Sequence, residues 1–192
     1  MNIKCHRIPS ILLTAISFFS SCTIFAAESR PNVIVILADD LGLGDISFYV
    51  QTIQNKTPVV ETPALDSLAS NSLWFTDGHS ATSLCAPTRY AVMSGNNNYR
   101  SYAPWGVWST FGKTAFQTGH ATLGTVARDA GYKTGFIGKW HLGGDFLIPG
   151  RAEFYRGPKN GDLTGKVNLT RWISGGPKDC GFDYVFTSPC GI

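Results

Sequence analysis

A cysteine and an arginine lie close together in the segment SLCAPTRYAVMSG, residues 83–95. Cys85 stands just before Pro87, and we expect a helix that begins at Pro87 and closes at Gly95. The N-terminus of a helix presents unpaired N–H groups and a positive potential, which favour an anion. Arg89, four residues after Cys85, adds a positive charge within reach of that position. Cys85 and Arg89 are therefore candidates for chemistry on an anionic group.

Two further pairs of polar residues stand at the ends of predicted strands. Asp39 and Asp40 follow the apolar run 32–38, and adjacent carboxylates beside glycines suit a hard divalent cation. Taken by itself, an Asp pair is more typical of a turn or a helix cap. Lys139 and His141 close another predicted strand, where alternation points both side chains the same way. A cation and an imidazole at the carboxyl edge of a sheet suit an anionic substrate.

Alternating strands and helices are expected to position these residues. The predicted strands are 32–38, 72–77, 132–140 and 180–186, and the predicted helices are 63–70, 87–95 and 122–131. The faces expected to point inward are Leu65, Leu68 and Ala69 in the first helix, and Leu123, Val126, Ala127 and Ala130 in the third. This order predicts an α/β fold with a mostly parallel sheet covered by helices on both faces. The weakly periodic residues 143–176 predict an excursion over the surface.

The first 27 residues are typical of a secretory signal peptide. Lys4 and Arg7 precede an apolar run that is short for a membrane span. We therefore expect a signal peptide at 1–27, a catalytic part at 28–192, and export to the periplasm or the medium. A lipid on Cys22 is the alternative that would hold the protein at a membrane. Loss of Lys4 and Arg7 lowers the formal net charge from +3 to +1, which offers no basic surface for nucleic acid.

Export leaves three cysteines, an odd number in an oxidising compartment. Cys180 and Cys190 are ten residues apart, and either a disulfide or two buried thiols fits this spacing. Cys85 is then the unpaired one. Only three residues separate it from Arg89, too few for the loop of cysteine-dependent phosphatases. The sequence also contains no Cys-x-x-Cys redox pair.

The segment CAPTRYAVMSG resembles the signature of type I, arylsulfatase-like sulfatases of the alkaline phosphatase superfamily, in which Cys-x-Pro-Ser-Arg leads into a helix. The segments PNVIVILADDLGLGD, TPALDSLASNSLWFTD, GYKTGFIGKWHLG and GFDYVF resemble flanking motifs of this family in the same order. Together they span residues 30–186. Thr88 stands where Ser is usual, and it keeps the hydroxyl.

The resemblance implies that Cys85 is oxidised before folding, by a formylglycine-generating maturation enzyme, to Cα-formylglycine. One hydroxyl of the hydrated aldehyde would attack sulfur and expel the alcohol. Loss of the proton from the second hydroxyl would then regenerate the aldehyde and release sulfate. A serine sulfate ester has no second hydroxyl and cannot release sulfate in this way. The resemblance further implies a cation, Ca²⁺ or alternatively Mg²⁺, bound by Asp39, Asp40 and the modified Cys85.

The same resemblance gives roles to the remaining polar residues. Arg89 would fix the diol, and Lys139 would bind the sulfate oxygens. His141 would take the proton from the second hydroxyl. Asp45 is expected to brace the glycine turn that follows the Asp39–Asp40 pair.

The implied reaction is the hydrolysis of sulfate monoesters, with sulfated carbohydrates as the first expectation and aryl sulfates as the second. Trp105, Trp108 and Phe111 would either offer platforms for a sugar ring or pack in the core. One alternative is a phosphate or phosphonate monoester hydrolase of the same superfamily. Another is a truncated, non-catalytic member that binds an anion.

Members of this family are typically much longer than this chain. They carry further metal ligands as an Asp-Asn or Asp-His pair, and no such pair follows His141 in this sequence. We therefore expect an amino-terminal part of a sulfatase, incomplete in its metal site and inactive by itself.

Overall fold

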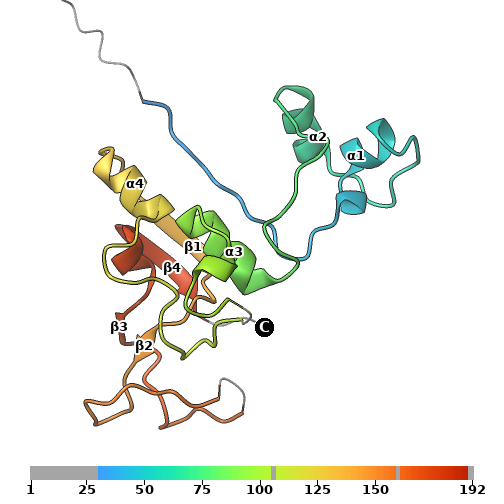
Figure 1. The fold of residues 1–192 in the computed structure, drawn as a ribbon. Helices are drawn as coiled ribbons and strands as arrows, with labels where there is room; N and C mark the ends of the chain where they lie inside the picture. The colour runs from blue at the N-terminus through green and yellow to red at the C-terminus, as the bar shows by residue number, and fades with distance from the viewer. Residues whose placement is uncertain (1–29, 105–106, 159–160, 190–192) are drawn as a thin grey trace, which may run out of the picture. The chain divides into compact units, whose positions relative to one another are not determined.

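A computed structural model describes residues 30–104, 107–158 and 161–189. The chain divides into two compact units, 1–38 and 39–192. All helices and strands of the described residues belong to the second unit: η1 (Leu43–Asp45), α1 (Ser47–Thr52), α2 (Pro63–Ser70), α3 (Cys85–Ser94), η2 (Asn98–Arg100), α4 (Leu123–Asp129), β1 (Gly135–Lys139), β2 (Asp145–Phe146), β3 (Trp172–Ser174), η3 (Pro177–Cys180) and β4 (Tyr184–Ser188) (Figure 1). Here η marks a short 3-10 helix.

Some sequence predictions fall outside these residues, namely the signal peptide, the lipid anchor at Cys22, Trp105, and Cys190 as a partner for Cys180. Within the described ranges, no helix has the length and apolar character needed to cross a membrane.

Two predicted strands are absent from the structure. Residues 32–38, in the first unit, are irregular, and Ile34 and Ile36 are more than four-fifths exposed, at 83% and 84%. Residues 72–77 are also irregular. Both predictions are wrong here because a run of β-branched or aromatic residues shows only that a segment suits a pleated, half-buried surface. A strand forms when a neighbouring strand pairs with it.

A parallel pair of strands forms the sheet that leads to the candidate site. β1 runs parallel to β4, with Gly135 opposite Tyr184 and Lys139 opposite Ser188. This pairing confirms the predicted parallel α/β arrangement. The crossover between the two strands is long, as a parallel connection requires.

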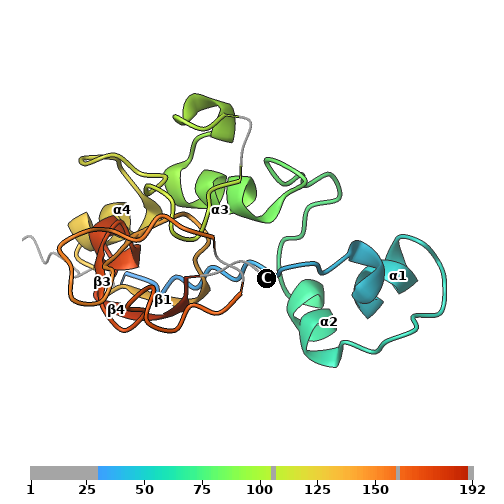
Figure 2. The same ribbon diagram turned by 90° about the horizontal axis from the view of Figure 1, so that it is seen from below.

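Helix α3 packs through a hydrophobic core against the end of β1, and Figure 2 shows α3 beside the β1–β4 pair. The buried members of this core are Ala86, Tyr90, Met93, Trp108, Ala115, Phe116, Trp140, Leu142 and Cys180. The opposite face of the sheet carries exposed apolar side chains, including Ile137 and Phe186. In the described residues α3 therefore covers one face of this small sheet.

Helix α4 begins where the sequence predicts, but it packs through a different face. Thr122 is the N-cap, and its hydroxyl accepts a hydrogen bond from the Thr125 N–H in a capping box. The predicted inward face is wrong, because Val126 is 60% exposed and Leu123 is also exposed. The contact runs through Gly124, where a Cβ atom would lie 2.3 Å from the Cys180 carbonyl oxygen.

Helix α2 has the predicted bounds, with Pro63 in its first turn. Its predicted apolar face is exposed, including Leu65 and Leu68. A polar side holds the helix to α1 instead. The Asp66 carboxylate accepts hydrogen bonds from the Ser47 hydroxyl at 2.5 Å and from the Phe48 N–H at 2.8 Å. Burial of apolar residues is therefore not what fixes this helix in the described structure.

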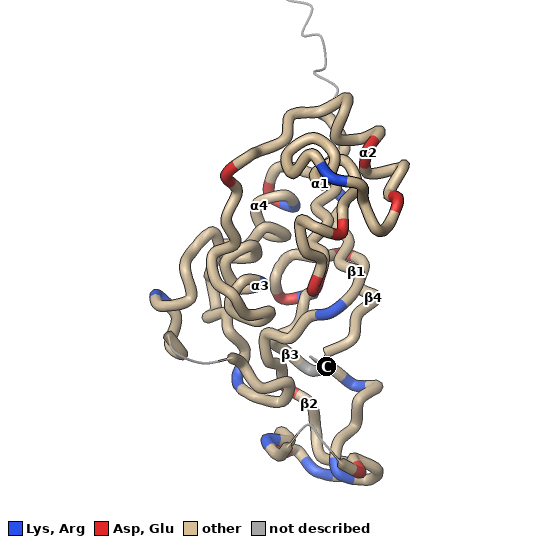
Figure 3. Tube along the Cα trace, turned by 90° about the vertical axis from the view of Figure 1, so that its right-hand side faces the viewer, with Lys and Arg blue, Asp and Glu red and all other residues tan. Residues whose placement is uncertain are grey.

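Residues 143–176, which we call the excursion, contribute most of a second small core. β2 pairs antiparallel with β3. Phe146 is fully buried and stands edge-on to Phe111, with ring centroids 5.5 Å apart. Tyr155 and Val167 complete this second cluster. The predicted surface excursion is thus a folded element. The charged residues in its loops beyond β2 are mostly Lys and Arg, shown blue in Figure 3.

Candidate active site

Helix α3 presents Cys85 at its first position. The helix begins at Cys85, two residues before the predicted start at Pro87, and it ends at Gly95 with φ +66°. The left-handed conformation at Gly95 explains why the helix stops there. Pro87 lies within the first turn, where its missing N–H breaks no helical hydrogen bond. Cys85, half-buried, therefore lies in the positive potential of a helix N-terminus.

The loop before Cys85 is held by the hydroxyl of Thr88. This hydroxyl donates to the Thr82 carbonyl oxygen at 3.0 Å, and the two threonine hydroxyls lie 3.0 Å apart. The Thr82 hydroxyl also contacts the Leu84 carbonyl at 3.2 Å. Thr88, the one departure from the usual signature, thus fixes the turn that delivers Cys85.

His141 reaches Cys85 from just beyond the end of β1. Its Nδ1 lies 3.4 Å from the Cys85 Sγ. The residue is buried, with 5% of its surface exposed, and its φ is +55°. A non-glycine residue takes this left-handed backbone conformation when its surroundings impose it. The structure thus brings together two predicted site residues that are 56 positions apart.

Arg89 and Lys139 meet at the Asp39 carboxylate. Lys139 Nζ donates to Asp39 Oδ2 at 2.8 Å, and Arg89 Nη2 donates to the same oxygen at 3.0 Å. Arg89 Nη1 also donates to the Lys139 carbonyl oxygen at 2.7 Å, which ties α3 to the end of β1. The Lys139 ammonium, with Arg89, holds the pKa of Asp39 below its ordinary value, against a smaller opposing effect of burial.

The predicted metal ligands are not gathered into one group. Asp39 engages the two cations, whereas Asp40 is exposed and has φ +59°. The described residues contain no cluster of three or more His, Cys, Asp or Glu side chains that could hold a metal ion. The carboxylate oxygens of Asp39 and Asp40 are nevertheless the hard donors that Ca²⁺ and Mg²⁺ prefer. The two carboxylates therefore suit such a cation by their chemistry, but they provide fewer oxygen ligands than it needs.

The structure decides two lesser predictions. Asp45 braces the glycine turn as expected, because its Oδ2 accepts a hydrogen bond from the Gly42 N–H at 2.8 Å. Trp108 and Phe111 do not form sugar platforms, since both are almost completely buried, at 3% and 1% exposure. Their aromatic rings pack within the two cores instead.

Sequence reasoning missed the role of Asp39 as a shared counter-ion. The predicted function was metal binding, while the structure shows ion pairs with Arg89 and Lys139. These partners lie 50 and 100 positions away. No local pattern signals such a pairing, because it depends on which chain segments the fold brings together.

Comparisons with known proteins identify the family. The Sulfatase family model matches residues 31–173. The chain is 40% identical over 148 residues to steryl-sulfatase from Homo sapiens, covering 74% of this chain and 24% of that protein. It is 32% identical over 165 residues to N-acetylgalactosamine-6-O-sulfatase from Bacteroides thetaiotaomicron, covering 86% and 28%. The chain therefore belongs to the sulfatase family.

Solved structures share the fold. One concerns the metabolism of multiple glycosaminoglycans by Bacteroides thetaiotaomicron; it has a TM-score of 0.60 and 32% identity, and covers 83% of this chain and 28% of that one. Another is Ps i-CgsB in complex with k-i-k-neocarrahexaose, with a TM-score of 0.56, 26% identity, and coverage of 82% and 28%. The chain spans about a quarter of the length of the relatives and structures described here.

Proposed function

We propose that the protein hydrolyses sulfate monoesters at a site built around residue 85. The observation that carries this proposal is the contact of the Cys85 Sγ with the His141 imidazole at 3.4 Å, at the N-terminus of α3. Arg89 lies on α3, as Cys85 does, and Lys139 is the last residue of β1, two positions before His141. A helix N-terminus, two cations and an imidazole suit an anionic ester. Membership of the sulfatase family supports this assignment.

The proposal includes oxidation of Cys85 to Cα-formylglycine by a maturation enzyme. The present Sγ stands where the aldehyde or diol oxygens would be. The hydrated aldehyde supplies one hydroxyl as a nucleophile and a second that allows sulfate to leave. His141 is within reach to accept a proton from a group on residue 85. Lys139 and Arg89 provide positive charge for sulfate oxygens and for the modified side chain.

A divalent cation, Ca²⁺ or alternatively Mg²⁺, is part of the proposal. Asp39 and Asp40 would provide carboxylate oxygens, and the modified Cys85 another. Ca²⁺ takes about six to eight oxygen ligands, so further ligands would be required. Such a cation would lower the charge on the ester and favour the deprotonated nucleophile.

Sulfated carbohydrates are the proposed substrates. Two similarities support this choice: the relative named N-acetylgalactosamine-6-O-sulfatase, and the solved structure that contains k-i-k-neocarrahexaose. With a signal peptide at 1–27, the protein would meet such substrates outside the cytoplasm. Residues 28–192 would form the amino-terminal part of the catalytic domain.

The first experiment is mass spectrometry of the tryptic peptide that ends at Arg89, from protein made in its own host. Iodoacetamide marks a remaining thiol at Cys85, and a hydrazide reagent marks an aldehyde. We expect the hydrazide adduct and little alkylation. A fully alkylated Cys85 would remove the proposed nucleophile.

The second experiment compares hydrolysis of a sulfate monoester with that of the matching phosphate monoester, using the protein as its gene encodes it. We expect a higher kcat/KM for the sulfate. A preference for the phosphate would assign the site to phosphate or phosphonate hydrolysis instead. Absence of both activities, despite an aldehyde at position 85, would favour a non-catalytic anion-binding role.

A further inference from the structure

His141 stands in a short segment, residues 141–144, that is enclosed and conformationally strained. Its φ of +55° is unusual for a histidine. The following residue, Leu142, is completely buried, and its carbonyl oxygen accepts a hydrogen bond from the Ala115 N–H at 2.9 Å. A strained conformation persists only when neighbouring groups hold it in place. The position of the imidazole therefore depends on the contacts of the residues that flank it.

Gly144 connects this segment closely to residues 111–115. Its N–H donates to the Gly112 carbonyl oxygen at 3.0 Å. A Cβ atom at Gly144 would lie 2.5 Å from the indole nitrogen of Trp172. At Gly143, with φ +75°, a Cβ atom would lie 2.5 Å from the Lys113 carbonyl oxygen. A larger residue would therefore clash with the 111–115 backbone at position 143 and with the Trp172 ring at position 144.

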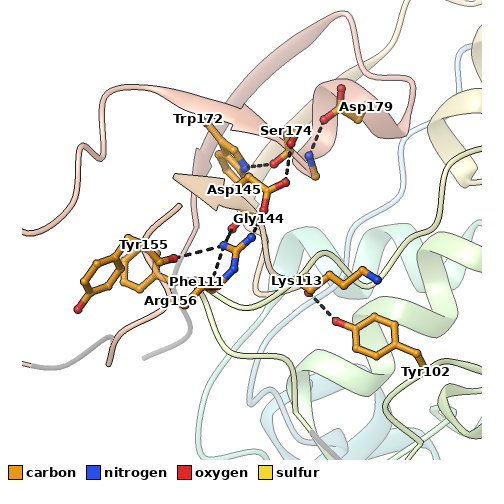
Figure 4. A network of polar contacts seen from close by, with 11 residues as sticks. Tyr102, Phe111, Lys113, Gly144, Asp145, Tyr155, Arg156, Trp172, Ser174 and Asp179 are labelled. Carbon is orange, nitrogen blue, oxygen red and sulfur yellow. Dashed lines mark hydrogen bonds and ion pairs between the residues drawn. The ribbon is translucent and has the colours of Figure 1, made fainter. Parts of the chain in front are cut away.

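The Arg156 guanidinium lies beside both Phe111 and Gly144 (Figure 4). Its Nη1 donates to the Phe111 carbonyl oxygen at 3.1 Å, to the Gly144 carbonyl oxygen at 3.3 Å, and to that of Tyr155 at 3.2 Å. Its Nη2 donates to Asp145. A planar guanidinium has five N–H donors in a fixed arrangement, which a lysine ammonium cannot reproduce. Arg156 thus joins the 111–115 segment to the end of the 141–144 segment.

Asp145 orients this guanidinium from the other side. One of its carboxylate oxygens pairs with Arg156, and the other accepts a hydrogen bond from the Ser174 hydroxyl at 2.5 Å. The Trp172 indole N–H donates to the Ser174 carbonyl oxygen at 3.0 Å. Asp145 and Ser174 lie opposite each other in β2 and β3. The excursion therefore holds Arg156 in place through a continuous set of hydrogen bonds.

We propose that Arg156, oriented by Asp145, is a positioning residue for His141. This inference rests on the proposed function. Arg156 fixes Gly144 against Phe111, and so keeps the strained His141 backbone in the conformation that brings the imidazole to residue 85. Loss of this link lets the 141–144 segment sample other conformations. The expected consequence is a lower kcat with little change in KM, because sulfate binding by Lys139 does not depend on this link.

The test compares Arg156→Lys and Arg156→Gly with the matched control Arg151→Lys. Arg151 lies in the same excursion, is 66% exposed, and its nearest carboxylate, on Glu153, is 3.9 Å away. A misplacement of about 1 Å can cost about 100-fold in rate. We expect kcat on a sulfate monoester to fall by about 10- to 100-fold in both Arg156 variants. The Arg151 variant should match wild type.

Two further measurements separate positioning from general instability. Added guanidinium at millimolar concentration should restore part of the kcat of Arg156→Gly, and should leave the control unchanged. Amide hydrogen exchange should be faster at Gly144 and Ala115 in Arg156→Gly, and should slow again with guanidinium. Thermal unfolding of the same samples shows whether the variants are folded at the assay temperature.

Each outcome decides the inference. Unchanged kcat in the Arg156 variants of an active enzyme would overturn it. A loss of kcat without rescue, in step with a fall in Tm, would also overturn it and assign Arg156 to stability alone. If the protein as its gene encodes it carries an aldehyde at position 85 and still releases no sulfate, the proposed function fails. Hydrogen exchange at Gly144 then still decides whether Arg156 holds the segment: faster exchange supports the link, and unchanged exchange overturns it.

Discussion

At the scale of single residues, the Asp39 carboxylate organises the positive charges of the site. One oxygen accepts hydrogen bonds from both Lys139 and Arg89. An isolated pair of cations would repel each other, whereas a shared carboxylate reduces this repulsion and fixes their positions. Because Asp39 is 36% exposed, solvent screens part of the attraction. Its main effect is therefore geometric: it aligns the two side chains that would meet a sulfate group.

The proposed proton transfer by His141 predicts a specific kinetic defect. Replacement His141→Asn removes the imidazole next to residue 85 and should lower kcat by about 100- to 10,000-fold. Because the proposed step releases sulfate, the alcohol product should appear in a burst ahead of sulfate. Rapid-quench measurement of both products checks this. The exposed His79, whose imidazole pairs with Asp77, gives the control His79→Asn. Equal kinetics for the two variants would contradict the role of His141.

Arg89 should not tolerate replacement by lysine. Its guanidinium contacts the Lys139 carbonyl and the Asp39 carboxylate at once, and an ammonium cannot reach both with the same geometry. Loss of one hydrogen bond that involves a charged group costs about 1.5–3 kcal/mol, so kcat/KM should fall by about 10- to 100-fold. Steady-state kinetics of Arg89→Lys against Arg100→Lys tests this. Equal values for the two variants would show that charge alone is needed at position 89.

At the scale of elements, polar contacts rather than apolar burial join α1 to α2. The Asp66 carboxylate accepts hydrogen bonds from the hydroxyls of Ser47 and Thr62 and from the Phe48 N–H. The Ser47 hydroxyl is the largest of several influences that hold the pKa of Asp66 below its ordinary value of 3.8. A carboxylate with a lowered folded-state pKa stabilises the fold above its unfolded pKa. That stability is lost as the pH falls through the folded pKa.

The α1–α2 contact should therefore weaken in acid. Asp66→Asn should lower Tm at neutral pH relative to wild type, and the difference should shrink at pH values below 3.8. The neighbouring, exposed Glu61 supplies the control Glu61→Gln, which should change Tm little at either pH. Thermal unfolding followed by circular dichroism measures all three proteins. A Tm difference for Asp66→Asn that stays constant with pH would show that its carboxylate charge is not involved.

At the scale of the whole molecule, local patterns predicted the helices better than the strands. Helix ends depend on residues close in sequence, such as Thr122 and Gly95. The strand predicted at 32–38 would need a neighbouring strand to pair with. The β-branched pattern of these residues gives no information about such a partner. The site residues Cys85 and His141 were predicted from motifs. Their contact, and the link through Arg156, arise from long-range folding that no local spacing encodes.

The proposed metal binding depends on more of the molecule than one loop, because Asp39 and Asp40 alone give too few oxygen ligands for Ca²⁺. The remaining ligands would come from other parts of the assembled protein, so binding should also stabilise it. Removal of divalent ions with EDTA should abolish sulfate release and lower Tm, and Ca²⁺ should restore both. Asp40→Asn should raise the Ca²⁺ concentration needed for half-maximal recovery of Tm by about tenfold or more. The control Asp129→Asn, on exposed α4, should need the same concentration as wild type. Full activity and an unchanged Tm after EDTA would exclude the predicted role of Asp39 and Asp40 as metal ligands.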